Sequence, residues 1–332
     1  MTTPRIVVAR APLRVSLAGG GTDLPSYAEQ FGGLVISLAI DRYVCVTVYP
    51  REFRGTLRAA LEHTETVSHA DELTNRFARA AMRRAGQTTN IQLASFADAP
   101  SGTGLGGSGA FTVALMHALL YHQDPRAEEL AEHASAIEMV DLERPVGKHD
   151  HYMAALGGLH ALHIGRTDIH AEPFAMTEAI RSYVEERLLL FYTGQSRDAG
   201  QVLTSQDKLT RQRNDAVMAP LHGIRALAQR LLDSLREGRV ADVGPTLDEH
   251  WRYKLRLSDR VATPRVERLY DVAMEAGAEG GKLLGAGGGG FLLMAAHDGE
   301  QDQVRKAMFA EGATELPFAA APSGSTASGL DL

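Results

Sequence analysis

Three glycine-rich segments, far apart on the chain, are each suited to binding a phosphate group. They are residues 18–23 (Ala-Gly-Gly-Gly-Thr-Asp), 100–109 (Pro-Ser-Gly-Thr-Gly-Leu-Gly-Gly-Ser-Gly) and 285–290 (Gly-Ala-Gly-Gly-Gly-Gly). A loop without Cβ atoms lets backbone N–H groups approach an anion, and a helix that follows it adds the positive end of its dipole. One such loop is weak evidence. Three of them, with Asp23 and Ser108 at the edges of two, indicate a nucleotide phosphotransferase.

A cluster of ionisable side chains lies at residues 148–151, which read Lys-His-Asp-His. Asp150, flanked by a lysine and two histidines, is a candidate general base because its neighbours can hold its pKa. The alternative is an ordinary polar loop, where such clusters usually occur. The residues themselves leave both interpretations open.

Glu138 is unusual because it shares one face of a predicted helix, 125–142, with small and apolar residues. A carboxylate on a packed face is costly unless it is paired or bound to a metal. Periodicity alone slightly favours a glutamate at the helix edge whose head reaches water. Ser108, where the second glycine segment becomes a helix, can bind Mg²⁺ beside nucleotide phosphates or simply cap the helix.

The spacing of apolar residues predicts that these candidates lie in a chain that contains both strands and helices. Strands are predicted at 5–9, 13–17, 34–39, 43–49, 56–67, 90–96, 159–164, 187–192, 291–295 and 316–320. Helices are predicted at 26–31, 71–85, 110–120, 125–142, 198–209, 217–237, 240–258, 264–276 and 301–309. Because 332 residues exceed one typical core, we predict two domains, 1–170 and 171–332.

The composition excludes several classes of protein. A net charge of −7, from 34 basic and 41 acidic residues, argues against a surface that binds nucleic acid. No apolar run approaches a membrane span, and the N-terminus lacks a signal-peptide pattern. The single cysteine, Cys45, rules out an internal disulfide. We therefore expect a cytoplasmic protein without nucleic-acid or membrane partners, and a homodimer is compatible with the sequence.

With these segments in this order, the chain resembles the GHMP kinases, the superfamily of galactokinase, homoserine, mevalonate and phosphomevalonate kinases. The resemblance covers nearly the whole chain and rests on residues 11–23, 100–109 and 282–291. It implies an α+β fold of two domains. The N-terminal domain should be like domain 2 of ribosomal protein S5 and the C-terminal domain ferredoxin-like, with the active site in the cleft between them.

Within the superfamily, the chain most resembles the D-glycero-D-manno-heptose 7-phosphate kinases, through residues 18–27, 147–152, 191–197 and 250–254. Galactokinases usually carry Gly-Glu-His-Thr-Asp where this chain has Gly-Gly-Gly-Thr-Asp. This difference disfavours galactose as the substrate. The resemblance implies that ATP and Mg²⁺ are used to phosphorylate the anomeric hydroxyl of a heptose 7-phosphate, a small-molecule sugar phosphate. The alternatives are a kinase of an unphosphorylated sugar such as fucose, and a catalytically silent sensor of sugar and nucleotide.

The resemblance also implies catalytic and metal-binding roles. Asp150 matches the catalytic aspartate that faces the reacting hydroxyl, and Arg14 matches the arginine that pairs with it. Lys148 is expected to help offset the developing charge. Glu138 and Ser108 match the two Mg²⁺ ligands.

Binding residues follow from the same match. The ATP phosphates are expected at Gly102, Gly104, Leu105, Gly106, Gly107, Ser108 and Gly109. The sugar phosphate is expected at Gly20, Gly21, Thr22, Asp23, Ser196, Arg197, Gly287 and Gly288, with Arg197 as the candidate for its distal phosphate. Gly107 and Gly109 replace the usual Ser and Ala of the second motif, so we expect a more flexible loop with one hydroxyl fewer. His149 and His151 stand where the heptose kinases often carry glutamine.

Overall fold

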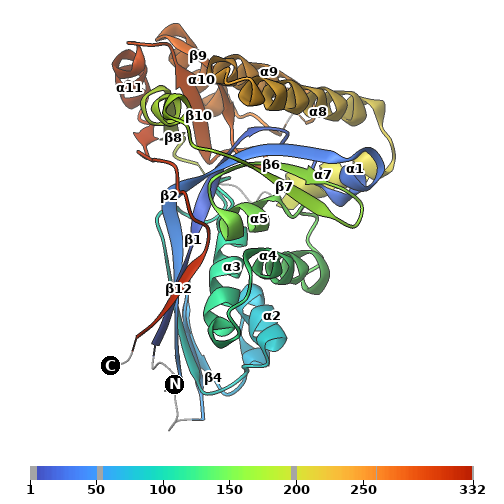
Figure 1. Ribbon diagram of the computed structural model, residues 1–332, viewed down its shortest axis with the longest axis vertical. Helices are drawn as coiled ribbons and strands as arrows, with labels where there is room; N and C mark the ends of the chain where they lie inside the picture. Colours follow the sequence, from blue (N-terminus) through green and yellow to red (C-terminus); the bar gives the residue numbers. More distant parts are fainter. Residues whose placement is uncertain (1–5, 51–54, 196–199, 259, 331–332) are drawn as a thin grey trace.

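Two long antiparallel strands form the centre of the first sheet in the computed structural model, which describes residues 6–50, 55–195, 200–258 and 260–330 (Figure 1). They are β1 (Ile6–Ala18) and β2 (Gly33–Pro50), which pair along most of their length. β2 also pairs with β6 (Leu159–Ile164) through its first residues and with β5 (Ile91–Ala97) through its last. The remaining strands of this sheet are β3 (Leu57–Ala60), β4 (Thr64–Val67), β7 (Ile169–Phe174) and β12 (Thr326–Leu330).

Each of the two central strands was predicted as two shorter ones. Of the predicted strands 5–9 and 13–17, the described residues 6–9 and 13–17 fall within β1, and 34–39 and 43–49 fall within β2. The predicted gaps coincide with an irregularity, because the register between the two strands shifts at Pro12/Leu13. A sheet absorbs such extra residues as a local bulge, which interrupts the alternation of side chains without ending the strand.

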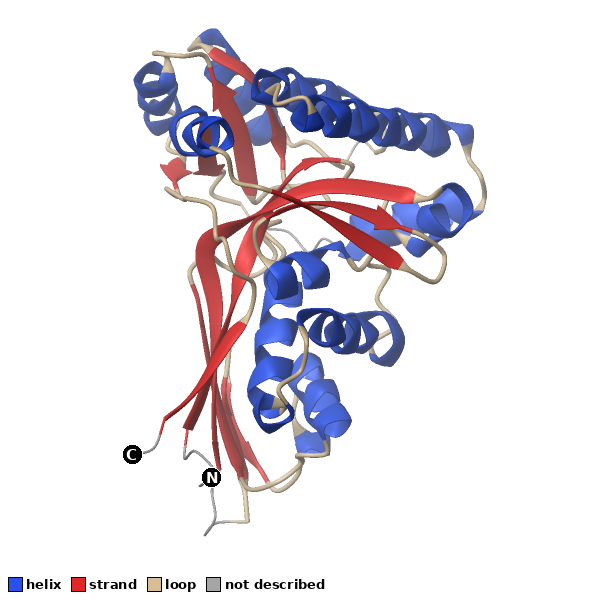
Figure 2. Ribbon diagram, in the orientation of Figure 1, coloured by secondary structure: helices blue, strands red, loops and turns tan. Residues whose placement is uncertain are grey.

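Helices cover one face of the first sheet (Figure 2). The central one is α3 (Gly107–Leu119), which begins in the second glycine segment and is buried along most of its length. Its neighbours are α2 (Arg76–Ala85), α4 (Ala127–Ala136) and α5 (His149–Leu156). The predicted helix 125–142 is α-helical only to Ala136, and it continues as the π-helical turn η3 (Ile137–Asp141).

The second sheet has the strand order β11 (Thr314–Glu315), β8 (Leu188–Tyr192), β10 (Phe291–Ala296) and β9 (Ala278–Leu283). The helices that come after β7 in the chain are α6 (Glu178–Ser182), α7 (Gly200–Arg211), α8 (Asp215–Arg236), α9 (Val243–Leu255), α10 (Pro264–Glu275) and α11 (Gln301–Ala310). Shorter pieces are α1 (Pro25–Phe31), η1 (Ala70–Glu72), η2 (Tyr121–Gln123), η4 (Tyr183–Arg187) and η5 (Val240–Asp242). Within the described ranges, no helix combines the length and apolarity that crossing a membrane requires.

The end of the chain returns to the first sheet. β12 pairs antiparallel with β1, from Arg10 with Thr326 to Ile6 with Leu330, so the two described ends lie close together (Figure 1). A strand from the predicted second domain thus belongs to the first sheet, and residue 170, the predicted boundary, lies inside β7. The pairing has a physical reason, because β1 would otherwise present an open edge of unpaired backbone groups.

Candidate active site

All three glycine segments open onto one cleft of about 830 Å³. Its walls come from both halves of the chain, including β1, the start of α3 and α5 on one side and α9 and β9 on the other. The predicted site residues that line it are Arg14, Gly20, Gly21, Asp23, Gly102, Gly104, Gly106, Gly107, Ser108, Asp150 and Gly287. Residues separated by more than 260 positions therefore meet in one place.

The second and third glycine segments pack directly against each other. A Cβ added at Gly104 would lie 2.6 Å from the carbonyl oxygen of Leu284, and the φ of Gly104 is +86°. Only glycine allows both this approach and this backbone conformation. The contact fixes the second glycine segment against the second half of the chain.

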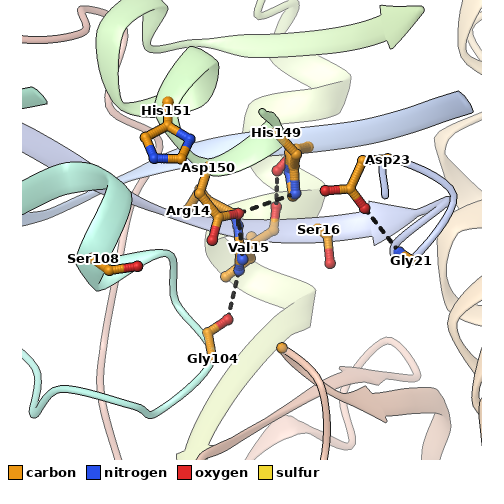
Figure 3. A network of polar contacts seen from close by, with 12 residues as sticks. Arg14, Val15, Ser16, Gly21, Asp23, Gly104, Ser108, His149, Asp150 and His151 are labelled. Carbon is orange, nitrogen blue, oxygen red and sulfur yellow. Dashed lines mark hydrogen bonds and ion pairs between the residues drawn. The ribbon is translucent and has the colours of Figure 1, made fainter. Parts of the chain in front are cut away.

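Asp150 is held by Arg14 (Figure 3), and both residues line the cleft. Its Oδ1 accepts hydrogen bonds from Arg14 Nε at 2.9 Å and from Nη2 at 2.6 Å, and Arg14 Nη1 donates to the carbonyl of Gly104 at 2.5 Å. Burial raises the pKa of the Asp150 carboxyl, but the charge of Arg14 and its hydrogen bonds outweigh this and lower the pKa to about 2. Asp150 is thus a permanently ionised acceptor at neutral pH.

His149 lies against the same carboxylate, with its Nδ1 3.2 Å from Asp150 Oδ1. Burial and the nearby charge of Arg14 lower the pKa of His149 to about 3. The imidazole is therefore neutral at physiological pH and adds no positive charge to the cluster. Asp23 also lines the cleft, and burial, reinforced by the negative charge of Asp150, raises its pKa to about 6.

Glu138 is 1% exposed and lies inside the protein, beside Ser108. The Ser108 hydroxyl donates to its Oε2 at 3.4 Å, and Arg144 Nη1 approaches the same oxygen at 2.5 Å. His151 Nε2 lies 3.1 Å from Oε1. The weakly favoured interpretation, a glutamate reaching water, is wrong, because the side chain is buried and three polar groups surround it.

Gly109 lies within the first turn of α3 and packs on Asp150. A Cβ there would lie 2.8 Å from Asp150 Cβ, so the missing methyl group lets the helix approach the acidic side chain. Gly107 is the first residue of the same helix, and a Cβ there would meet open space. The expectation of a more flexible loop therefore needs correction for Gly109, which belongs to a helix and is closely packed.

Six predicted site residues are not among those that line the cleft, and their predicted roles stay predictions: Thr22, Leu105, Gly109, Glu138, Lys148 and Gly288. Lys148 Nζ lies 2.7 Å from Glu132 Oε2, with which it forms an ion pair. Thr22 is fully buried, and its hydroxyl donates to the Gly19 and Leu34 carbonyls. Leu105 is a core residue whose carbonyl accepts from the Arg14 backbone, and the Gly288 N–H donates to Val261.

Ser196 and Arg197 lie outside the residues that the structure describes, so their predicted roles stay predictions. Conversely, some polar residues that line the cleft were given no role from the sequence, among them Ser16, His250, Lys254 and Lys282. The sequence did contain a signal for Lys282, because this charged residue stands between glycines and leucines in a strand-like run. A lysine is almost never fully buried unless its charge is paired.

Comparisons with known proteins agree with this architecture. The model of the GHMP kinases N terminal domain matches residues 72–158, and that of the GHMP kinases C terminal matches 231–314. The chain is 27% identical over 306 residues to D-glycero-alpha-D-manno-heptose 7-phosphate kinase of Campylobacter jejuni, covering 87% of this chain and 89% of that protein. It is 30% identical over 339 residues to a galactokinase of Roseiflexus sp., covering 86% and 82%.

Solved structures show the same fold. A D-glycero-D-manno-heptose 1-phosphate kinase from Bacteriodes thetaiotaomicron superposes with a TM-score of 0.78 at 23% identity, covering 97% of this chain and 98% of that one. The chain thus shares its fold with this solved structure.

Proposed function

We propose, from the premise that the chain belongs to the GHMP kinase family and is an ATP-dependent sugar kinase, that it phosphorylates the anomeric hydroxyl of a heptose 7-phosphate to give the 1,7-bisphosphate. The observation that carries the proposal is the Arg14–Asp150 pair, set in a cleft that joins three glycine segments. The Campylobacter jejuni relative supports the choice of sugar.

The acceptor hydroxyl is oriented by Asp150. A carboxylate with a pKa of about 2 is a weak proton acceptor, since general bases work best with a pKa near the operating pH. Phosphoryl transfer through a loose transition state asks mainly for positioning and charge neutralisation, so an early proton transfer is not required. Asp150 therefore fixes the attacking oxygen, and Arg14 offsets the charge that develops beside it.

The nucleotide lies along the start of α3. The free N–H groups at this helix N-terminus, together with those of the second glycine segment, bind its phosphates. Phe77, Phe96 and Phe111 line the cleft, and Phe96 is 68% exposed although it is a large apolar side chain. An exposed aromatic ring at the rim of a phosphate-binding cleft suits stacking on a flat base.

Mg²⁺ fits the pair formed by Ser108 and Glu138. Both offer oxygen ligands 3.4 Å apart, and Mg²⁺ is usually held by one or two carboxylates together with substrate phosphates and water. The described residues contain no group of three or more His, Cys, Asp or Glu side chains able to hold a metal by themselves, which agrees with an ion that arrives with the nucleotide. When bound, the ion supplies positive charge that offsets the phosphate oxygens.

Glu138→Gln and Ser108→Ala are each expected to raise the Mg²⁺ concentration for half-maximal activity by at least about tenfold. The two effects should not add, because both groups are assigned to one ion. Activity titrated with Mg²⁺ at fixed ATP measures this, with the exposed Glu128→Gln on α4 as the matched control. Titration curves like that of the wild type in both variants would remove the ion from this pair.

The choice of substrate is tested by ADP release from a panel of heptose 7-phosphate, the same heptose without phosphate, galactose and fucose. We expect kcat/KM for heptose 7-phosphate to exceed that for each unphosphorylated sugar by about 100-fold, the value of one or two charge-assisted contacts. Faster turnover of an unphosphorylated sugar would replace the proposal with a simple sugar kinase. The absence of ADP release with every sugar would favour a sensor.

A further inference from the structure

We infer that Lys282 and Lys254 form the receptor for the phosphate group that the sugar already carries, with Ser16 and His250 completing it. The inference rests on the proposed function and adds the place where the distal phosphate binds. It assigns a specificity role to two side chains from the second half of the chain.

Both lysines are buried in the wall of the cleft. Lys282, in β9, is 1% exposed, and its Nζ donates to Ser16 Oγ at 3.2 Å and lies 2.8 Å from His250 Nδ1. Lys254, in α9, is 8% exposed, and its Nζ donates to the carbonyls of Leu283 at 2.6 Å and Gly285 at 2.5 Å. Each ammonium group thus has only neutral partners in the described ranges.

The other basic residues of the cleft are already compensated. Arg14 is paired with Asp150, and Arg144 is paired with Glu138. Over the part of the chain that the structure describes, no ion pair joins Lys254 or Lys282 to a carboxylate. A buried, unpaired ammonium group is costly, so the two lysines are explained best by an anion that arrives from outside.

In the free protein, the pKa values of both lysines are lowered. Burial, together with the charge of Arg14, lowers the pKa of Lys254 to about 7, and burial, Lys254 and Arg14 lower that of Lys282 well below its ordinary value. A phosphate dianion between the two amines would favour their charged forms. Binding of the sugar phosphate should therefore take up protons from the solvent.

The spacing fits the acceptor sugar. Ser16, which receives the Lys282 hydrogen bond, follows Arg14 by two residues in β1, and residues two apart in a strand lie on one face about 7 Å from each other. A phosphate at Lys282 is then separated from the hydroxyl at Asp150 by roughly the length of a sugar. His250 lies beside the first glycine segment, because its Cε1 is 3.8 Å from a Cβ placed at Gly20.

The test uses Lys282→Met and Lys254→Met, with Lys306→Met, an exposed lysine on α11, as the matched control. We expect each cleft variant to raise KM for heptose 7-phosphate by at least about tenfold and to change KM for ATP less than about twofold. The preference for heptose 7-phosphate over the unphosphorylated heptose should fall by the same factor. The melting temperature should not drop, because methionine replaces a buried amine that has no carboxylate partner with an apolar chain of similar length.

Calorimetry provides a second readout that a merely structural lysine would not affect. Heptose 7-phosphate is titrated into the protein in two buffers of different ionisation enthalpy. We expect net proton uptake on binding to the wild type, and a smaller uptake in Lys282→Met. If one variant fails to fold, the other is measured in the same way.

The outcomes separate this inference from the proposed function. If the wild type uses heptose 7-phosphate and both variants keep its KM, the lysines are not the receptor, and the proposed function stands. If the wild type uses only unphosphorylated sugars, the proposed function fails, and the inference fails with it. A rise confined to KM for ATP would assign the lysines to the nucleotide and overturn the inference.

Discussion

Asp150→Asn is expected to lower kcat by about 10²–10⁴-fold, the range for removal of an acid–base or hydroxyl-orienting group. Asparagine keeps the shape of the side chain but loses the negative charge that faces the acceptor hydroxyl. The protein should remain folded, because the amide oxygen and the Gly104 carbonyl still accept hydrogen bonds from Arg14. Steady-state turnover with saturating ATP and heptose 7-phosphate measures the loss, and the melting temperature reports the fold.

Asp302→Asn is the matched control, since Asp302 is an exposed residue on α11 with a side chain 82% accessible. We expect its kcat to stay within about twofold of the wild type, as is usual for surface substitutions. Turnover of Asp150→Asn near that of this control would move the catalytic role to another residue.

Arg14→Met is expected to lower kcat by about 10²–10³-fold and to introduce an acid limb into the pH–rate profile. In the wild type, the pKa of Asp150 is lowered from 3.8 to about 2, so the carboxylate stays ionised from pH 5 to 8 and produces no such limb. Without Arg14, burial is no longer offset and raises the pKa of Asp150. Activity should then fall as the pH decreases through the new pKa.

The measurement is kcat/KM for the sugar between pH 5 and pH 9. Arg10→Met is the matched control, because Arg10 lies in the same strand but is exposed and bonds to Thr326 rather than to a carboxylate. Its profile should match that of the wild type. Normalised profiles of Arg14→Met and wild type that superimpose would contradict the account of how Asp150 is kept ionised.

The sequence predicted the three glycine segments, but not which of them contact each other. Their order identified the family, which is confirmed by the matching models and relatives. The close contact of Gly104 with Leu284 could not be read from the chain, because the two segments are 180 residues apart and each is locally a plausible phosphate loop. Sequence patterns identify loops that can approach an anion, but not those that approach each other.

Glu138 and Lys282 show the limits of periodicity more sharply. A helical period of 3.6 residues placed Glu138 on one face with Ala131 and Ala134, which are both buried, but it could not decide whether the carboxylate reaches water or stays inside. Lys282 interacts with Ser16, 266 residues earlier in the chain. Its partner is set by the way the two halves pack together, which local patterns do not encode.

The end of the chain illustrates the same point. Residues 323–329 are rich in serine and glycine and are equally suited to a flexible tail or an edge strand. The open edge of β1 decides between these, and β12 forms on it. In contrast, α3 and β10 lie close to their predicted ranges, because long apolar runs with clear boundaries carry their own signal.

The central claim is that the anomeric hydroxyl of heptose 7-phosphate receives the γ-phosphoryl group, and phosphorus NMR of the reaction mixture tests it most directly. We predict one new sugar-phosphate resonance that couples to the anomeric proton, while the original ester at C7 keeps its coupling to the methylene protons. The reducing end of the sugar should disappear at the rate at which ADP forms. A new resonance that couples to any other ring proton, or a reducing end that persists after ADP has formed, would contradict the account.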